Sequence, residues 1–164
     1  MTNKMKLTGM AALVLLVIGF TYYVFTAPYN RFPGVRIGGT LTPALADWRT
    51  LINVPTADLK LAGFPPFVVH IFYVPEADGI ITATRPDNGY WGRRLRKNPN
   101  GFLRIGDETY ALRATEILGE ARIPYLEAYG GKYRMSMGND FTGEIIVGTN
   151  EPLNTWEVFY WTAR

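Results

Sequence analysis

Cysteine is absent from the 164-residue chain, and histidine occurs once, as His70. The lack of cysteine excludes disulfides, thiolate metal ligands and a cysteine nucleophile. With one histidine and no cysteine, the chain also lacks the ligand spacing of zinc hydrolases and the arrangement of a catalytic triad. We therefore predict no catalytic residue and no metal site. His70 lies within an apolar run, which favours a core side chain bonded to a neighbouring backbone group.

Charge is absent from residues 7–30, the 24 positions between Lys6 and Arg31. Residues 7–26 match the length of about 20 residues that an α-helix needs to cross a bilayer. Because hydrocarbon offers no partner for backbone amides, one spanning helix is the simplest interpretation of this run. The sequence therefore predicts a single-pass membrane protein in contact with membrane lipid.

The flanks of the apolar run predict its orientation. Lys4 and Lys6 precede the run and no cation follows it at once, so the N-terminus is expected to be cytoplasmic. The C-terminal domain would then be periplasmic or extracellular. A cleaved signal peptide is the competing interpretation, but the best cleavage position, after Ala27, lies between Phe25 and Pro28. We therefore expect an uncleaved signal anchor.

The chain divides into residues 1–27, a cytoplasmic tail with the transmembrane helix, and residues 28–164, one extracytoplasmic domain long enough to bury a core. Without Lys4 and Lys6, the second part has 15 Lys and Arg against 14 Asp and Glu, a formal charge of +1. A domain so close to neutral has no broad field that attracts polyanions. Nucleic acid is therefore not an expected partner.

Hydrophobic patterning after residue 28 is mostly that of strands. Residues 67–74 are apolar apart from one histidine and rich in β-branched and aromatic side chains, which is typical of a central strand buried on both faces. Two Asp/Gly turn pairs predict hairpins, one between residues 67–74 and 80–84 and one between residues 101–105 and 109–117.

The remaining segments predict two short helices and the closing strands. Asn88 can cap a helix that stops before Asn98-Pro99, because a residue before proline avoids the α region. A second helix is expected within residues 120–133, and strands at residues 143–147 and 154–162. The expected fold class is one N-terminal transmembrane helix followed by a mainly β, α+β head.

One motif links this order of elements to known proteins: a helix containing tryptophan and leucine leads through Asn-Pro into a strand, here as Trp91, Leu95, Asn98 and Pro99. Residues 60–135 resemble the split β-barrel proteins, both the pyridoxamine-phosphate-oxidase-like flavin binders and, more closely, the deazaflavin-dependent nitroreductase family. The chain departs from the family pattern at Arg94, where an asparagine is usual. The resemblance implies a head with a split-barrel-like fold.

The resemblance also implies a cofactor site. In the family, the strand end before this helix and the helix itself help to hold a cofactor phosphate. The cofactor would be FMN or a deazaflavin. The matching positions in this sequence are Thr82, Thr84, Arg85, Trp91 and Arg93.

A cluster of cations surrounds the same helix. Six basic residues stand against the single carboxylate of Asp87: Arg85, Arg93, Arg94, Arg96, Lys97 and Arg104. Arginines near a helix start can grip a phosphate bidentately. Two other interpretations stay open, namely a solvated helix face and a surface that docks on anionic headgroups or on an acidic partner subunit.

Aromatic residues are dense near the end of the chain. Trp156, Val158 and Tyr160 share one face of the expected last strand, and Phe159 and Trp161 share the other. We expect the first set in the core. We assign Phe159 and Trp161 to a partner interface, because aromatic side chains on an edge strand are common anchors.

Two functions are consistent with these features. The first is a membrane-anchored accessory subunit whose head docks on a larger membrane protein complex through Arg93, Arg94, Lys97, Phe159 and Trp161. The alternative is a membrane-anchored, nitroreductase-like oxidoreductase that uses flavin or deazaflavin. We prefer the subunit, because the expected orientation places the head outside the cytoplasm, where flavin and its reductant are less readily supplied.

Overall fold

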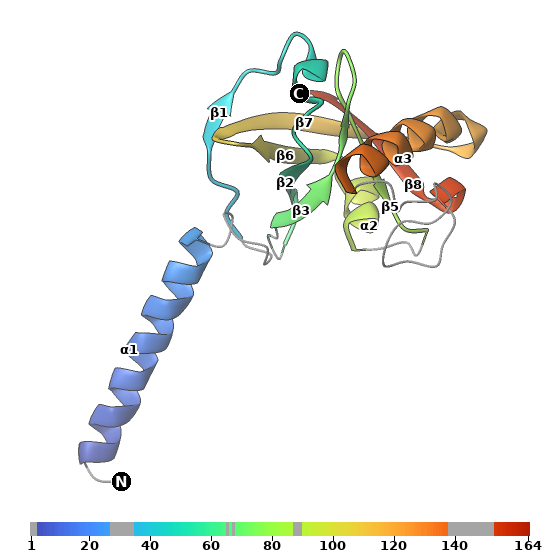
Figure 1. Cartoon of the computed structure of the whole chain (residues 1–164). Coiled ribbons are helices and arrows are strands. Elements are labelled where there is room, and N and C mark those ends of the chain that lie inside the picture. Colours follow the sequence, from blue (N-terminus) through green and yellow to red (C-terminus); the bar gives the residue numbers. More distant parts are fainter. Residues whose placement is uncertain (1–2, 27–34, 65, 67, 87–89, 138–152) are drawn as a thin grey trace.

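The computed structural model describes residues 3–26, 35–64, 66, 68–86, 90–137 and 153–164. A long helix, α1 (Asn3–Thr26), stands apart from an α+β head (Figure 1). In chain order the head contains β1 (Thr40–Thr42), η2 (Trp48–Leu51), β2 (Thr56–Leu61), β3 (Val68–Phe72), β4 (Val74–Pro75), β5 (Ile80–Thr84), α2 (Tyr90–Lys97), β6 (Asn100–Ile105), β7 (Glu108–Ile117), η3 (Gly119–Arg122), α3 (Ile123–Met137), η4 (Leu153–Thr155) and β8 (Glu157–Ala163).

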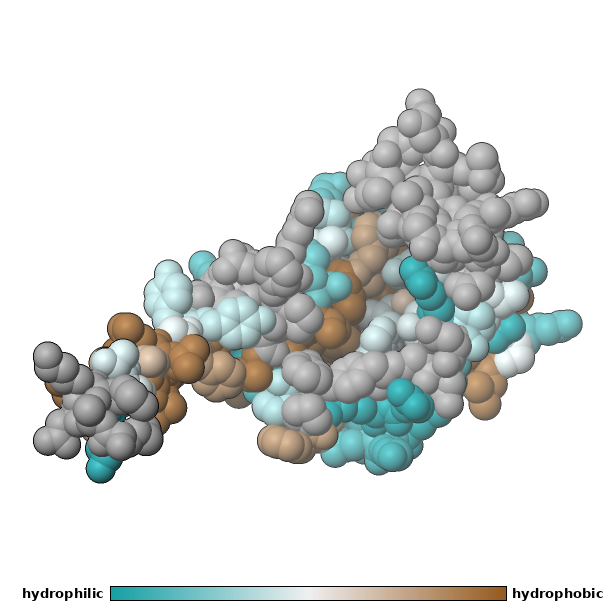
Figure 2. Space-filling view, turned by 90° about the horizontal axis from the view of Figure 1, so that it is seen from below, coloured by the Kyte–Doolittle hydropathy of each residue, from teal (hydrophilic) through white to brown (hydrophobic). Residues whose placement is uncertain are grey.

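Helix α1 confirms the helix predicted from the uncharged run. Its segment Lys6–Val24 is long and apolar enough to cross a membrane, and residues 6–23 are all exposed. Viewed from below, α1 forms a mainly hydrophobic rod beside the head (Figure 2). By length and composition, a helix of this kind fits either a membrane span or a signal sequence.

The strands form one curved sheet in the order β3-β2-β6-β7-β8-β5-β4. Strand β7 is the longest, and it pairs with β6 along one side. On its other side β7 pairs first with β1, in parallel, and then with β8, in antiparallel register. Strand β8 pairs with residues 112–117 of β7, and the short β1 pairs with residues 108–110, which β8 does not reach.

The second predicted hairpin is confirmed, whereas the first is confirmed only at its turn, because β5 pairs with Val74–Pro75 and not with residues 67–72. Strands β4 and β5 pair antiparallel around the Asp78-Gly79 turn, where the Glu76 amide donates a 2.8 Å hydrogen bond to the Gly79 carbonyl. Strands β6 and β7 pair around Gly106-Asp107, and Gly106 has a φ of +60°, a conformation that favours glycine. The expected helices are also present, as α2 and α3.

Two hydrophobic clusters lie on opposite faces of the sheet. The first fills its concave side and includes Trp48, Leu103 and Trp161. The second lies between the outer face of β5 and β8 and helix α3, and includes Ile81 and Leu126. On β7 the side chains alternate from residue 110, since residues 110, 112 and 114 are buried whereas residues 113 and 115 are exposed.

The prediction of a central strand at residues 67–74 is wrong. These residues form β3 and β4, which lie at the two ends of the sheet order and are separated by the fully buried Tyr73. The strand buried on both faces is β5, all five residues of which are buried. The physical reason is that β5 has the first cluster on one face and α3 on the other. The Asn88 cap and the strand predicted at 143–147 lie outside the described residues.

Candidate functional site

Helix α2 is fastened to the head by its apolar face. Trp91 and Leu95 are four residues apart and therefore share one face of the helix, and both pack against the first cluster. Leu95 is 3% exposed, and the Trp91 ring centroid lies 5.5 Å from that of Phe159 on β8. The tryptophan and leucine of the motif therefore attach α2 to the sheet through the first cluster.

Arg96 joins α2 to two strands. Its Nε donates a 2.9 Å hydrogen bond to Glu116 on β7, and its Nη2 contacts Glu116 again and lies 3.0 Å from a carboxylate oxygen of Glu157 on β8. These hydrogen bonds, led by those that Arg96 donates to Glu116, raise the pKa of Arg96 above its ordinary value. A Cβ on Gly92 would lie 2.8 Å from the Glu157 carboxylate, so glycine is needed for this close approach.

The predicted basic cluster therefore separates into two groups. Arg96 and Arg104 are engaged within the head; Arg104 is 6% exposed and donates to the carbonyls of Gly106 and Ile37, at 2.8 and 3.2 Å. The exposed group on α2 consists of Arg93 and Lys97, with Arg94 half-buried beside them and Arg85 exposed just after β5. Sequence spacing alone did not show which cations have internal carboxylate or carbonyl partners.

The residues that the resemblance assigns to a cofactor are only partly accessible. Thr82 is fully buried, and its hydroxyl accepts a 2.9 Å hydrogen bond from Trp161 Nε1. Thr84 is 9% exposed, and its methyl group lies 3.7 Å from where a Cβ on Gly92 would be. The structure thus brings the end of β5 and the start of α2 together, as the resemblance implies. Thr82, however, is buried in the core of the head and is not accessible to a ligand.

Phe159 and Trp161 do not form an exposed edge. They are 1% and 0% exposed and belong to the first cluster. Their strand, β8, lies between β7 and β5 and so is not an edge strand. The assignment of both residues to a partner interface is therefore corrected: the face on which they lie is the concave, filled side of the sheet.

His70 is also placed differently from its prediction. Its side chain is 48% exposed on the edge strand β3, and its Nδ1 lies 2.9 Å from a carboxylate oxygen of Asp58 on β2. The two residues face each other across the strand pair. His70 is therefore a surface residue paired with a carboxylate, and not a core residue bonded to backbone.

Lys132 is a buried charged residue that the sequence did not reveal. It lies on α3, is 6% exposed, and donates a 2.8 Å hydrogen bond to the Val54 carbonyl. Its Nζ also lies 4.1 Å from the ring centroid of Tyr73, a cation–π distance. Burial lowers the pKa of Lys132 to about 8. Lysine on a helix usually faces solvent, so the pattern carried no signal for this contact.

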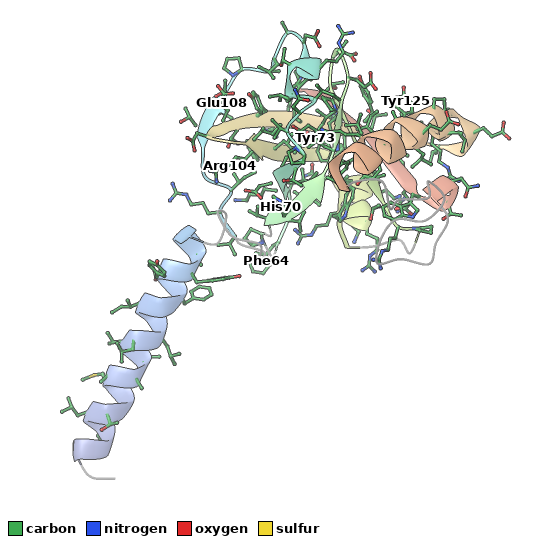
Figure 3. The ribbon with its side chains drawn as sticks, in the orientation of Figure 1. Phe64, His70, Tyr73, Arg104, Glu108 and Tyr125 are labelled. Atoms are coloured by element: carbon green, nitrogen blue, oxygen red, sulfur yellow. The ribbon has the colours of Figure 1, made fainter. Side chains whose placement is uncertain are left out.

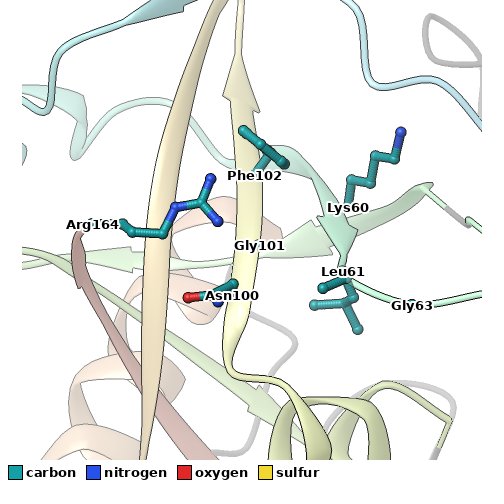
Figure 4. Close-up of a pocket in the computed structure, with 8 residues that line it drawn as sticks. Lys60, Leu61, Gly63, Asn100, Gly101, Phe102 and Arg164 are labelled. Atoms are coloured by element: carbon teal, nitrogen blue, oxygen red, sulfur yellow. The ribbon is translucent and has the colours of Figure 1, made fainter.

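A shallow pocket of about 150 Å³ lies at the junction of β2 and β6 (Figure 4). Lys60 and Arg164 supply two cations to its lining, and the Arg164 guanidinium lies 5.0 Å from the Phe102 ring centroid. No acidic side chain lines this pocket. Across the described ranges, no group of three His, Asp or Glu side chains is placed to hold a metal ion.

Comparison with known proteins identifies the fold. No family model and no curated protein matches the chain. Among solved structures, an FAD-binding protein from Mesorhizobium loti is similar, with a TM-score of 0.50 and 13% identity over 70% of this chain and 84% of that one. A candidate pyridoxamine 5′-phosphate oxidase from Listeria innocua gives a TM-score of 0.49 and 12% identity, over 68% of this chain and 86% of that one.

A heme storage protein from Vibrio cholerae is similar at the same level, with a TM-score of 0.48 and 14% identity over 68% of this chain and 83% of that one. At such identities the likeness shows the fold alone. The head therefore has a split-β-barrel-like fold, as its motif predicted.

Proposed function

We propose that the protein is a membrane-anchored accessory subunit whose extracytoplasmic head docks on a larger membrane protein complex. The observation that supports this is the arrangement of cations on α2. Arg96 is held by Glu116 and Glu157, and Trp91 and Leu95 are packed inward, so the helix is fixed in place. Arg93 and Lys97 remain exposed on this fixed helix, with Arg94 half-buried between them, as expected of a preorganised surface for an acidic partner.

Helix α1 is the proposed anchor. Its 24 residues span about 36 Å at 1.5 Å per residue, enough for a hydrocarbon core of about 30 Å. Lys4 and Lys6 favour a cytoplasmic N-terminus, and the head would then be periplasmic or extracellular. Phe25 and Pro28 disfavour signal cleavage after Ala27, which supports retention of the helix.

The burial of Thr82 favours the subunit over a flavin or deazaflavin oxidoreductase. A residue whose hydroxyl is bonded to Trp161 inside the core cannot also contact a cofactor without rearrangement of the barrel. Trp91 is likewise packed against Phe159. The cofactor function would have to depend on Arg85, Arg93, the end of β5 and the part of Trp91 that is not buried.

Native electrophoresis of the detergent-solubilised full chain tests the proposal. The wild type should co-migrate with a larger complex, and Arg93→Gln with Lys97→Gln should weaken that association by about 5- to 30-fold at low salt, because two charge contacts are lost. The loss should diminish as salt is raised. Arg49→Gln with Arg113→Gln is the charge-matched control, since both residues are exposed on other elements.

Two results would contradict the proposal. The first is a purified chain that migrates alone and carries the yellow colour or fluorescence of a bound flavin. The second is a reporter active only in the cytoplasm that works when fused after Arg164, because this would reverse the expected topology. A reporter active only outside the cytoplasm should work at that position instead.

A further inference from the structure

Phe64 is the most exposed large hydrophobic side chain in the described part of the chain, at 91%. It follows Gly63, whose φ of +108° turns the backbone after β2. Figure 3 shows Phe64 on the side of the head that lies nearest the end of α1. A single exposed hydrophobic residue is common on soluble proteins, so its meaning depends on what lies around it.

The tether to α1 restricts the position of the head. Helix α1 ends at Thr26, and the described part of the head begins at Val35. A fully extended chain spans at most about 3.6 Å per residue, so the Cα atoms of residues 26 and 35 lie within about 32 Å of each other. Tyr22 and Tyr23, in the last turns of α1, are 71% and 42% exposed, and tyrosine favours the headgroup layer at the end of a span.

One basic residue of α2, Arg94, adjoins the backbone next to Phe64. The guanidinium carbon of Arg94 lies 3.8 Å from where a Cβ on Gly63 would be, so α2 passes directly beside the turn. Arg93 and Lys97 are exposed on the same helix. An exposed aromatic side chain bordered by cations is typical of surfaces that bind an anionic bilayer, where the ring enters the interface and the cations meet the headgroups.

We infer that the described residues directly after β2, which end at Phe64, dock the head on the bilayer that α1 crosses, with Phe64 entering the headgroup layer and the α2 cations facing anionic phospholipid. This inference rests on the proposed function, because it needs α1 to be a retained span. It also refines that function. A partner that docks on Arg93 and Lys97 must present its acidic groups at the membrane surface, beside the lipid headgroups.

The absence of cysteine makes a site-specific probe straightforward. Phe64→Cys is labelled with an environment-sensitive fluorophore in the full chain, which is reconstituted into protein-free vesicles of phosphatidylcholine with or without phosphatidylglycerol. Ile52→Cys is the matched control, since Ile52 is 41% exposed and follows η2, the teal turn at the far end of the head in Figure 1. Lipids with a spin label near the headgroup quench a probe that enters the interface.

We expect quenching of the Phe64 probe to exceed that of the Ile52 probe by about twofold or more, and to increase with phosphatidylglycerol and decrease with salt. Equal quenching of the two probes on both vesicles, with the chain still resistant to alkaline extraction, would overturn the lipid assignment alone. Release of the chain by alkaline extraction would instead overturn the anchor and the proposed function with it.

Discussion

The indole Nε1 of Trp161 donates a 2.9 Å hydrogen bond to the hydroxyl of Thr82, and both side chains are fully buried between β8 and β5. The bond gives a partner to the indole N–H, which would otherwise be buried and unpaired, and it adds a side-chain contact between β8 and β5. It also explains two differences from the sequence-based expectations, since it holds Trp161 in the core and makes Thr82 inaccessible.

Thr82→Val tests the importance of this bond. Valine keeps the shape of threonine but removes the acceptor, so the Trp161 indole would be buried without a partner at a cost of about 1 to 3 kcal/mol. Urea unfolding of the detergent-solubilised chain, followed by tryptophan fluorescence, measures the change. Thr115→Val, at an exposed position of β7, is the control and should change stability by about 0.5 kcal/mol or less. Equal effects of the two substitutions would contradict a structural role for the Thr82 hydroxyl.

The Arg96 contacts predict a measurable coupling between α2 and β8. The Arg96 side chain is 34% exposed and that of Glu157 is 15% exposed, so solvent screens the pair only partly. Arg96→Gln leaves Glu116 and Glu157 without their shared cation and should cost about 1 to 3 kcal/mol, between the ranges for surface and buried pairs. A double-mutant cycle with Glu157→Gln should give a coupling of about 1 kcal/mol. A coupling near zero would mean that the ion pair does not hold α2 in place.

Local turn chemistry made much of the fold predictable. Asp78-Gly79 and Gly106-Asp107 located both hairpins, and α2 ends at Lys97, just before Asn98-Pro99. These signals depend on backbone preferences within a few residues. They do not depend on which elements pack together in the folded head.

Burial on both faces of a strand was not predictable in the same way. The run at 67–74 looked central by composition, but β5 is the doubly covered strand because α3 lies over it. The sequence pattern suggested that Phe159 and Trp161 are interface anchors, but both side chains lie on the concave face of the sheet, in the first hydrophobic cluster. Among the candidate site residues, the sequence identified the exposed cations Arg93 and Lys97 but could not separate them from Arg96, whose carboxylate partners are distant in sequence.

Gly79→Ala should strongly destabilise the head. A Cβ at this position would lie 2.0 Å from the backbone carbonyl oxygen of Trp161, so the β4–β5 turn or the β8 backbone must shift. We expect a loss of about 3 kcal/mol or more. Gly131→Ala is the matched control, because nothing lies within 4 Å of where a Cβ at this position would be. Alanine favours helix, so this variant should be more stable by about 0.5 to 1 kcal/mol. Thermal unfolding of both variants in detergent should show a lower midpoint for Gly79→Ala and a higher midpoint for Gly131→Ala than for the wild type.

The burial of Lys132 leads us to expect that the free energy of unfolding increases at alkaline pH. Burial lowers its pKa from 10.5 to about 8, so the unfolded chain binds more protons than the folded chain between these two pH values. Stability should therefore rise as the pH increases from about 8 to about 10, by on the order of 3 kcal/mol. Above about pH 10 the trend should reverse, because burial raises the pKa of Tyr73 and its phenol ionises first in the unfolded chain.

The variant Lys132→Met isolates this contribution. Methionine fills similar space without a titrating group, so the rise between pH 8 and 10 should disappear while the fall above pH 10 remains. Unfolding by urea at several pH values provides the comparison. If Lys132→Met keeps the full alkaline rise, another group is responsible for it.

Substitution of Trp91 distinguishes a role in packing from a role in cofactor binding. Its ring packs on Phe159 and the first cluster but is only partly buried, so Trp91→Ala should cost about 3 kcal/mol, the lower end of the range for large aromatic deletions. Trp91→Phe, which keeps a ring in the same place, should recover most of that loss. Titration of the solubilised wild-type chain with FMN and with a deazaflavin, followed by tryptophan quenching, should show no saturation. Saturable micromolar binding that Trp91→Ala abolishes would instead identify a cofactor groove beside α2, and the subunit proposal would then be wrong.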